Sequence, residues 1–491
     1  MRDNKPSATH GKGTLSRICY VGPSIESPDV STSLYLTQAA DTRPQTFELA
    51  ELLGALSYAL DLTEGQPAGH CIRCCFIGTR IGEALNLPDA ALGELYYTLL
   101  LKDLGCSSNA ARICELYLAD DITFKRDFKT IDTSLSAALR FVFAQTGLET
   151  GLSERIRALI NVIHKGGKIA REMIETRCHR GADIAGRMRF SQAVQDGILS
   201  LDEHWDGSGQ PQGLKRNQIP QIANIALLAQ VIDVFHAESG PEAALAEAIA
   251  RSGVWFDPTL VTAFIQAQQI PEFWSALASP ELAARVFTMI PAQQCEPVDE
   301  DYLDDIAAAF ADVVDAKSPY TADHSNRVTL YTDIIAEELG LSPDHRRWLR
   351  RAALLHDLGK LAVSNQILDK PGKLDAAEWA MIRSHPGHSE TILARVSAFA
   401  DIAPIAAAHH ERLDGKGYPY GLKGEEICLE ARILTVADVF DALTAERPYR
   451  AAMPIAKALS ILDADANSAF DPTCITALKS GLGRLNATVA A

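Results

Sequence analysis

Hydrophobic and polar residues along most of the chain follow the period of an amphipathic α-helix. In one stretch, Leu349, Ala353 and His356 lie four and three positions apart, which places them on one helix face. Alanine and leucine dominate long segments, and clusters of β-branched residues are few. Two runs near the start, 17–22 and 33–38, are compatible with short strands. The pattern as a whole predicts an all-α fold.

One sequence pattern occurs twice. Four motifs recur in the same order, and a histidine precedes the first of them at the same distance in both copies, as His70 and His324. Ordered matches of this length indicate two copies of one helical domain. The paired motifs are LLKDLGC (100–106) and LLHDLGK (354–360), EHWDGSGQPQGLK (203–215) and ERLDGKGYPYGLK (411–423), VIDVF (231–235) and VADVF (436–440), and FDPT (256–259) and FDPT (470–473).

The repeat predicts the domain organisation of the 491 residues, a length that exceeds one ordinary core. The first copy is longer because it carries an insertion around 120–168, whose spacing predicts two amphipathic helices near 133–146 and 152–164. The predicted parts are an N-terminal segment (1–44), the first copy (45–269), a linker (270–298), the second copy (299–482) and a C-terminal tail (483–491).

The second copy concentrates histidine and aspartate at helix positions that face its core. A single such histidine is most simply a core residue satisfied by a hydrogen bond. A set of five histidines and two aspartates is different, because buried polar groups cost free energy unless something binds them. Imidazoles and carboxylates bind first-row transition metals, and two ions about 3.5–4 Å apart can catalyse in-line displacement at phosphorus. The seven residues are His324, His356, Asp357, His385, His409, His410 and Asp438.

These residues and the motifs around them resemble the HD-GYP family of the HD phosphohydrolase superfamily. The resemblance covers the whole second copy, including HDLGK (356–360), HHERLDGKGYP (409–419) and DALTAERPYR (441–450). It implies a helical domain that hydrolyses cyclic di-GMP, or in some members 3′,3′-cGAMP, with iron or manganese. The fold class that follows is all-α, with two tandem HD-type helical domains of which the N-terminal one is degenerate.

The resemblance also implies a role for each residue. Asp357 would bridge two ions, and Lys360 would contact the substrate phosphate and offset charge in the transition state. Arg447 and Tyr449 match positions near the family's substrate pocket. The ligands of the first ion would be His324, His356, Asp357 and Asp438, and those of the second His385, His409 and His410.

The number of ions is predicted from one further position. Some family members have a glutamate one helical turn before the first histidine, where it can help bind a third ion. Tyr320 occupies that position in this chain. The sequence therefore predicts two ions and not three.

The GYP loop, Gly417-Tyr418-Pro419, has two interpretations of similar weight. The glycines around it can adopt positive φ, so the loop can be a rigid connection between helices. The family also uses this loop to contact partner proteins, some of them diguanylate cyclases. The sequence leaves a homodimer open as well.

The first copy has lost part of the motif. In the alignment of the motifs, His70, Asp103, His179 and Asp233 are retained opposite His324, Asp357, His385 and Asp438. A cation beside Asp103 opposes metal binding, so this copy is predicted to bind no metal pair and to hydrolyse nothing. A scaffold for packing or dimerisation is favoured over a regulatory ligand-binding domain. The replacements are Lys102 for His356, Leu201 and Asp202 for His409 and His410, Cys106 for Lys360, and Gly209-Gln210-Pro211 for the GYP loop.

Composition excludes several classes of partner. The formal net charge of −17 opposes a nucleic-acid or acidic-membrane surface, although metal ions can invert the field around a small anionic substrate. The first residues lack the apolar core of a signal peptide, and no apolar run is long enough to span a membrane. A cytoplasmic protein is expected.

The leading functional hypothesis is a phosphodiesterase that hydrolyses cyclic di-GMP to linear pGpG, to GMP or to both in bacterial second-messenger signalling. The alternatives are a 3′,3′-cGAMP phosphodiesterase, a cyclic dinucleotide receptor without hydrolytic activity, and a phosphohydrolase for another nucleotide. The intact ligand set and Lys360 oppose the receptor, and the GYP loop opposes another nucleotide.

Overall fold

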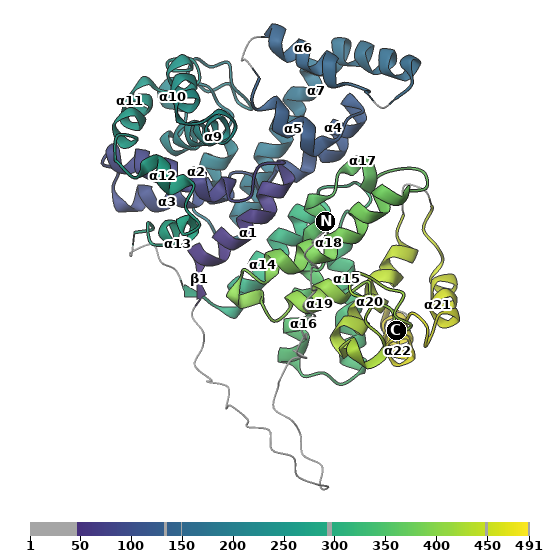
Figure 1. Ribbon diagram of the computed structural model, residues 1–491. Coiled ribbons are helices and arrows are strands. Elements are labelled where there is room, and N and C mark those ends of the chain that lie inside the picture. The colour runs from purple at the N-terminus through teal and green to yellow at the C-terminus, as the bar shows by residue number, and fades with distance from the viewer. Residues whose placement is uncertain (1–46, 132–134, 149, 292–296, 447–449, 490–491) are drawn as a thin grey trace, which may run out of the picture.

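Two helical bundles follow each other along the chain (Figure 1). The named elements are helices except for two short strands. These strands, β1 (Phe47–Glu48) and β2 (Pro297–Val298), pair antiparallel. The predicted all-α class is confirmed, whereas the runs at 17–22 and 33–38 lie outside the described residues. The computed structural model describes residues 47–131, 135–148, 150–291, 297–446 and 450–489.

The first bundle contains the helices up to the segment that joins the bundles. Helix α9 is buried on all sides from Ile222 to Val234 because it lies between other helices, and it is mostly apolar there except for Asn224, Gln230 and Asp233. The helices are α1 (Leu49–Thr63), α2 (His70–Ala84), α3 (Asp89–Leu101), η1 (Cys106–Asn109), α4 (Ala110–Tyr117), α5 (Asp121–Phe128), α6 (Leu135–Gln145), α7 (Leu152–Arg187), α8 (Gln192–Leu199), η2 (Arg216–Gln218), α9 (Gln221–Ser239), α10 (Pro241–Ala250), α11 (Pro258–Ala267), α12 (Phe273–Leu277) and α13 (Leu282–Phe287).

The second bundle repeats much of this order in a shorter chain. Its central helix, α15, packs against both α16 and α20, and the three helices present polar residues to the middle of the bundle. The helices are α14 (Glu300–Asp315), α15 (His324–Glu338), α16 (Pro343–Leu355), η4 (Leu358–Ala362), α17 (Asn365–Leu368), α18 (Ala376–Leu393), η5 (Ser397–Phe399), α19 (Ala403–Ala408), η6 (Gly424–Glu426), α20 (Leu429–Thr444), α21 (Ile455–Ala464) and α22 (Pro472–Val489).

The predicted insertion forms α5, α6 and the beginning of α7. The helix that starts at Leu152 does not end near His164 but continues for 36 residues to Arg187. Gly166 and Gly167 each destabilise a helix by about 1 kcal/mol relative to alanine. The helix continues through them because one of its sides is buried, at Val162, Met173 and Cys178.

The two bundles share a hydrophobic core along α1, which lies between them beside α18 (Figure 1). Tyr302 of α14 donates a hydrogen bond to the carbonyl oxygen of Met188 in the first bundle, at 2.9 Å. The Arg395 guanidinium lies 4.1 Å from the centre of the Tyr58 ring. Apolar burial and specific polar contacts thus hold the bundles together.

Asp121, the first residue of α5, reaches into the second bundle. Its carboxylate accepts hydrogen bonds from the Ser364 hydroxyl at 3.0 Å and from the Asn365 backbone N–H at 2.9 Å. It also lies 3.7 Å from the Lys317 ammonium group, and both side chains are almost fully buried. Although burial raises the pKa of the Asp121 carboxyl group, Lys317 and the other donors lower it below its ordinary value.

We expect Asp121→Asn to lower the free energy of unfolding by about 2 kcal/mol, because the buried Lys317 loses its counter-charge and one acceptor is lost. The neighbouring Asp120→Asn is the matched control, since asparagine also caps a helix well and Asp120 caps α5. Thermal unfolding of both variants measures the difference. Equal melting temperatures would contradict the importance of this contact.

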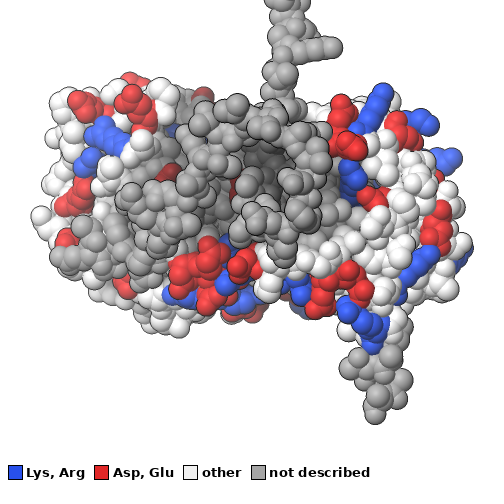
Figure 2. Space-filling model, turned by 90° about the horizontal axis from the view of Figure 1, so that it is seen from below, with Lys and Arg blue, Asp and Glu red and all other residues white. Residues whose placement is uncertain are grey.

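Acidic and basic side chains alternate over the described surface in Figure 2, where red and blue groups lie beside each other. The negative net charge is therefore not gathered into one field on that face. Among the described residues, no helix has both the length and the apolar character needed to span a membrane.

Candidate metal centre

Helix ends bring the seven predicted ligands of the second bundle together. His324 is the first residue of α15, and His356 and Asp357 lie where α16 gives way to η4. His409 and His410 follow the last turn of α19. The remaining two, His385 and Asp438, project from within α18 and α20. Six of the seven residues are at most 6 % exposed, and His410 is the partly exposed one.

The two oxygens of Asp357 face two different groups of ligands. Oδ2 lies 3.2 Å from Nε2 of His324 and 3.2 Å from Nε2 of His356. Oδ1 lies 3.3 Å from Nε2 of His385 and 3.7 Å from Nε2 of His409. Ligand atoms bonded to one ion at about 2.0–2.2 Å are separated by distances of this order. The carboxylate therefore lies where it can bridge two ions.

Asp438 and His410 complete the two groups. Oδ1 of Asp438 lies 3.4 Å from Nε2 of His324, and Oδ2 lies 3.9 Å from Nδ1 of His410. His385, His409 and His410 form one cluster of potential ligands, and His324, His356 and Asp438 form another. A third group, His356, Asp357 and His409, spans both, so all seven predicted residues lie in one connected cluster.

Hydrogen bonds orient the imidazole rings for binding. Nδ1 of His356, His385 and His409 lies 2.7, 2.6 and 2.5 Å from the carbonyl oxygens of Ala353, Ile382 and Ala406. An Nδ1–H that donates to a carbonyl oxygen leaves the lone pair on Nε2 directed at the cluster. Each backbone turn therefore fixes the ring that it carries.

Several ligand atoms are left without a protein partner. Within the described part of the chain, Nε2 of His324 and His356 and Oδ1 of Asp357 are buried and have no hydrogen-bond partner. Unsatisfied buried groups of this kind each cost about 1–3 kcal/mol unless they are bound. Divalent cations on the two sides of Asp357 would satisfy these atoms, so the residues present fit a metal site.

The pKa shifts of the cluster that contains His410, and of Asp357 beside it, favour metal binding. Burial lowers the pKa of His410 to about 3, and it also lowers the pKa of His385 and His409. Although burial raises the pKa of the Asp357 carboxyl group, His356 and Lys360 bring it well below its ordinary value. Neutral imidazoles and an ionised carboxylate are the forms that bind metals.

Asp441 is a site residue that the sequence analysis missed. Its Oδ2 lies 2.7 Å from Nδ1 of His324, and its other oxygen accepts from Nε of Arg327 at 2.6 Å. Burial lowers the pKa of His324, but the carboxylates of Asp357 and Asp441 more than offset this and raise it to about 9. Asp441 thus orients His324, as carbonyl groups orient the other rings.

We expect Asp441→Asn to weaken metal binding by about 10–100-fold, because the amide no longer fixes the ring of His324. Asp333→Asn is a suitable control, since Asp333 also lies on α15 with His324 but pairs with Arg346 and Arg350 of α16. Metal content after dialysis against a chelator series measures the effect. Unchanged retention in Asp441→Asn would contradict the role.

Lys360 lies beside the cluster, where it forms an ion pair with Asp357. Its side chain is 18 % exposed, so the ammonium group reaches the edge of the site. Tyr320 precedes α15 and is half-buried. Arg447 and Tyr449 lie outside the described residues.

The GYP loop covers one side of the histidine cluster. The ring of Tyr418 lies 4.8 Å from that of His410, and the Arg383 guanidinium lies 5.5 Å from the Tyr418 ring. The buried carboxylate of Glu411 accepts hydrogen bonds from the backbone N–H groups of the three residues after the loop, Tyr420, Gly421 and Leu422. Glu411 is a second residue missed from the sequence, although it directly follows the two histidines.

Two of the residues predicted to match ligand positions of the second bundle are wrong in the structure of the first bundle. A Cβ on Gly359 would lie 2.0 Å from the carbonyl oxygen of His385, and one on Gly105 would lie 1.9 Å from that of Arg177. Arg177, and not His179, therefore occupies the place of His385. His179 is exposed, and its Nδ1 lies 3.0 Å from the Glu175 carbonyl oxygen.

The second correction concerns Asp233. Its carboxylate contacts His70 at 2.7 Å and Arg73 at 2.7 Å, as Asp441 contacts His324 and Arg327. Asp233 is thus the counterpart of Asp441, and the place of Asp438 one turn earlier is taken by Gln230. The motif alignment failed because the aspartates Asp438 and Asp441 lie three residues apart on one helix.

Side-chain cations occupy the degenerate site. The ammonium group of Lys102 lies 3.0 Å from Nε2 of His70 and forms an ion pair with Asp103. Arg177 forms an ion pair with Asp202, which stands in the place of His410. Of the seven ligand positions, the first bundle keeps His70 and Asp103.

Comparison with known proteins assigns the chain to a family. A family model described as "HD domain" matches residues 132–260 and 308–474. The 3′3′-cGAMP-specific phosphodiesterase 3 of Vibrio cholerae serotype O1 is 56% identical over 440 residues, which cover 90% of this chain and 96% of the relative. The chain belongs to the HD-GYP family. The prediction of a phosphodiesterase of this family is confirmed.

The crystal structure of a cyclic GMP-AMP specific phosphodiesterase of V. cholerae is similar to this chain with a TM-score of 0.62 and 50% identity, over 89% of this chain and 98% of that one. A cyclic di-GMP phosphodiesterase response regulator of Xanthomonas campestris is 42% identical over 178 residues, which are 36% of this chain and 47% of the relative. HD-domain phosphohydrolases depend on metal ions, and the second bundle supplies groups that can hold them.

Proposed function

We propose that the second bundle holds a binuclear metal site, at which the protein hydrolyses a phosphodiester bond of 3′,3′-cGAMP. The division of the Asp357 oxygens between two groups of histidines carries the proposal. The preference for 3′,3′-cGAMP is supported by the V. cholerae relative, which matches this chain over nearly its whole length. Cyclic di-GMP, hydrolysed to linear pGpG, to GMP or to both, is the second candidate, because shorter matches connect the chain with cyclic di-GMP phosphodiesterases.

The ligands of the two ions would be His324, His356, Asp357 and Asp438 for one, and Asp357, His385, His409 and His410 for the other. Two divalent ions, iron or manganese, would activate water and stabilise the charge that develops at phosphorus. The protein itself contributes the fixed rings, the shared carboxylate and a buried floor that keeps these groups in position.

Lys360 would contact the substrate phosphate. Its ammonium group is paired with Asp357 and reaches the edge of the site. Metal ions bound to Asp357 would compete for that carboxylate and free the ammonium group for the substrate. A cation fixed there stabilises negative charge in the transition state.

Two ions per chain are expected rather than three. Tyr320 cannot supply the carboxylate that a third ion would share with the cluster. Metal analysis of protein loaded with iron or manganese under anaerobic conditions should give about two ions per chain. Three ions per chain in the full-length protein would contradict this expectation.

The GYP loop, Gly417-Tyr418-Pro419, would serve as a lid over the site and as a contact for a partner protein such as a diguanylate cyclase. Tyr418 against His410 supports the first role. The half-exposed ring of Tyr420 beside the loop supports the second. The domain limits 45–269 and 299–482, a homodimer and a cytoplasmic location stay predictions of the sequence.

Product analysis tests the proposed function. Metal-loaded protein would be mixed separately with 3′,3′-cGAMP, cyclic di-GMP and nucleoside triphosphates, and the products would be separated by chromatography. We expect metal-dependent loss of 3′,3′-cGAMP, and a slower loss of cyclic di-GMP. Binding of both cyclic dinucleotides without any hydrolysis would instead support a receptor, and hydrolysis of triphosphates alone would overturn the substrate class.

A further inference from the structure

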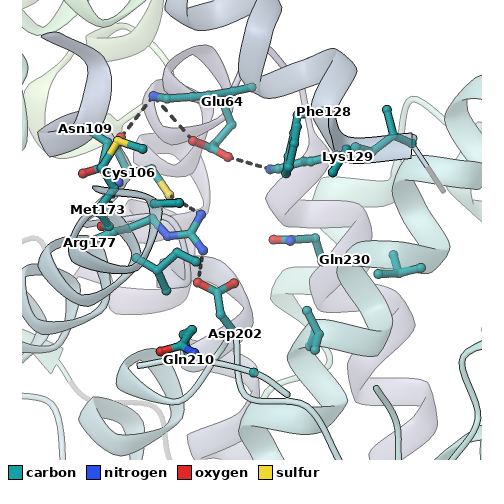
Figure 3. A pocket seen from close by; sticks show the side chains of 18 of the residues that line it. Glu64, Cys106, Asn109, Phe128, Lys129, Met173, Arg177, Asp202, Gln210 and Gln230 are labelled. Carbon is teal, nitrogen blue, oxygen red and sulfur yellow. Dashed lines mark hydrogen bonds and ion pairs between the residues drawn. The ribbon is translucent and has the colours of Figure 1, made fainter. Parts of the chain in front are cut away.

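The first bundle contains a cavity of about 430 Å³, which is within the size range of small-molecule sites. Its walls are mostly apolar and come from α4, α5, α7 and α9. The insertion supplies α5 and Ala138 of α6, so it builds a wall that the second bundle lacks. Figure 3 shows Phe128, Lys129, Arg177, Asp202 and Gln230 around the opening.

The cavity is the counterpart of the metal centre. Arg177, Asp202 and Gln230 line it, and they stand in the places of His385, His410 and Asp438. Cys106, which stands in the place of Lys360, lines it as well. The first bundle has thus replaced the metal ligands with other polar groups while the space in front of them stays open.

Gln230 has an unused acceptor in this cavity. The residue is 9 % exposed, and Oε1 is buried without a hydrogen-bond partner among the described residues. Its amide points from α9 toward the open space in Figure 3. A buried amide oxygen without a partner costs free energy that a ligand N–H or O–H would recover.

Charge and aromatic surface indicate what kind of ligand fits. The basic side chains that line the cavity are Lys125, Lys129, Arg177 and Arg251, and the acidic ones are Glu64 and Asp202. Lys129 pairs with Glu64, Arg177 with Asp202, and Arg251 with Glu247 behind the wall, so the four cations face three carboxylates and keep a net positive charge that an anion can share. Phe128 lines it too and is 42 % exposed, although large apolar side chains are usually covered. An excess of cations with an uncovered aromatic ring suits an anion that carries a flat ring.

We propose that this cavity is a regulatory site that binds a purine nucleotide without a metal ion and without hydrolysis. Lys129 and Arg177 meet the phosphate, Phe128 packs against the base, and the Gln230 amide hydrogen-bonds its edge. The choice of a nucleotide rests on the proposed function of the second bundle, of which this site is the altered copy.

A short connection joins the cavity to the metal centre. Phe124, Lys125 and Phe128 of α5 line the cavity, and Asp121 at the start of α5 holds Ser364 and Asn365. These two residues closely follow η4, which carries Lys360. A ligand that shifts α5 therefore acts on the segment that positions Lys360.

Variants at two alanines of α7 test the proposal in the full chain. Ala170 lines the cavity, so Ala170→Trp fills it, whereas Ala158→Trp adds the same ring elsewhere on the same partly buried helix. Equilibrium dialysis with GMP, AMP, linear dinucleotides and cyclic dinucleotides would be performed on both, in an Asp357→Asn background so that nothing is hydrolysed. Guanosine and adenosine serve as controls without phosphate.

We expect one more nucleotide site per chain in Ala158→Trp than in Ala170→Trp. In Gln230→Leu, nucleotide binding at that site should be at least tenfold weaker. The melting temperature of the Gln230→Leu variant should be unchanged or raised. Equal site numbers in the two tryptophan variants would overturn the proposal. Failure of the proposed function is distinguishable, because it would remove hydrolysis and leave this site intact.

Turnover by the metal-loaded protein without the Asp357 substitution tests the regulatory part. We expect the nucleotide that binds the cavity to change the hydrolysis rate at least twofold in Ala158→Trp and not in Ala170→Trp. Both variants keep the metal centre, so competition between the added nucleotide and the substrate at that centre affects both rates equally. Binding to the cavity without this difference would overturn the regulatory assignment.

Discussion

Asp357→Asn should lower the rate of cyclic dinucleotide hydrolysis by roughly three orders of magnitude or more, because under the proposed function it removes the carboxylate that two ions would share. Each oxygen of Asp357 lies within 3.7 Å of two imidazole nitrogens, so both ligand groups lose a member at once. The amide keeps the size of the side chain, which limits disturbance of the buried site. Hydrolysis rate and metal content per chain measure the effect.

The control is the equivalent pair in the first bundle. The double change Lys102→Met with Asp103→Leu replaces a buried ion pair by apolar side chains and leaves no charge unpaired. It should leave turnover within about twofold, since these residues do not contact the metal centre. Loss of turnover in the double variant together with normal metal content, or full activity of Asp357→Asn, would contradict the assignment of the catalytic bundle.

Asp103→Ala alone should lower the free energy of unfolding by about 3–5 kcal/mol, because it leaves the Lys102 ammonium group buried without its counter-charge. The Lys102 side chain is 0% exposed and Asp103 is 1% exposed. Burial raises the pKa of the Asp103 carboxyl group, but Lys102 brings it below its ordinary value, a direction that favours the ionised pair. His70 beside the ammonium group adds no negative charge.

Urea denaturation, followed by circular dichroism, measures this loss. The double variant Lys102→Met with Asp103→Leu should recover most of the stability, as apolar side chains of similar volume often replace buried ion pairs without cost. A small effect of Asp103→Ala would mean that water or a shift of Lys102 relieves the buried charge. Equal loss in the single and double variants would show that packing, and not charge, is responsible.

The repeat, the helices and the clustering of seven potential ligand residues could be predicted from the sequence. Helices follow from the spacing of apolar residues, which is local information. The ligands follow from residue chemistry, because histidine and aspartate at core-facing positions need a partner such as a metal ion. The structure brings those seven side chains together in one connected cluster.

The motif alignment gave two positions of the degenerate copy, those of His385 and Asp438, the wrong residues, and the reason is physical. Asp438 and Asp441 lie three positions apart on α20, so they share nearly one helix face, and a five-residue motif cannot distinguish them. The long insertion likewise allowed His179 to be aligned with His385. Contacts between distant segments, such as Gly105 with Arg177, were needed to place Arg177 and Gln230.

The sequence by itself determined that this protein is helical, duplicated and equipped for metal-dependent hydrolysis in its second half. Those properties depend on local periodicity and on the chemistry of single side chains. Only the tertiary structure decided that Asp441 and backbone carbonyl groups orient the histidines, and that the first half keeps an open cavity with Gln230 in it. These features depend on which segments pack together, and no local pattern encodes that packing.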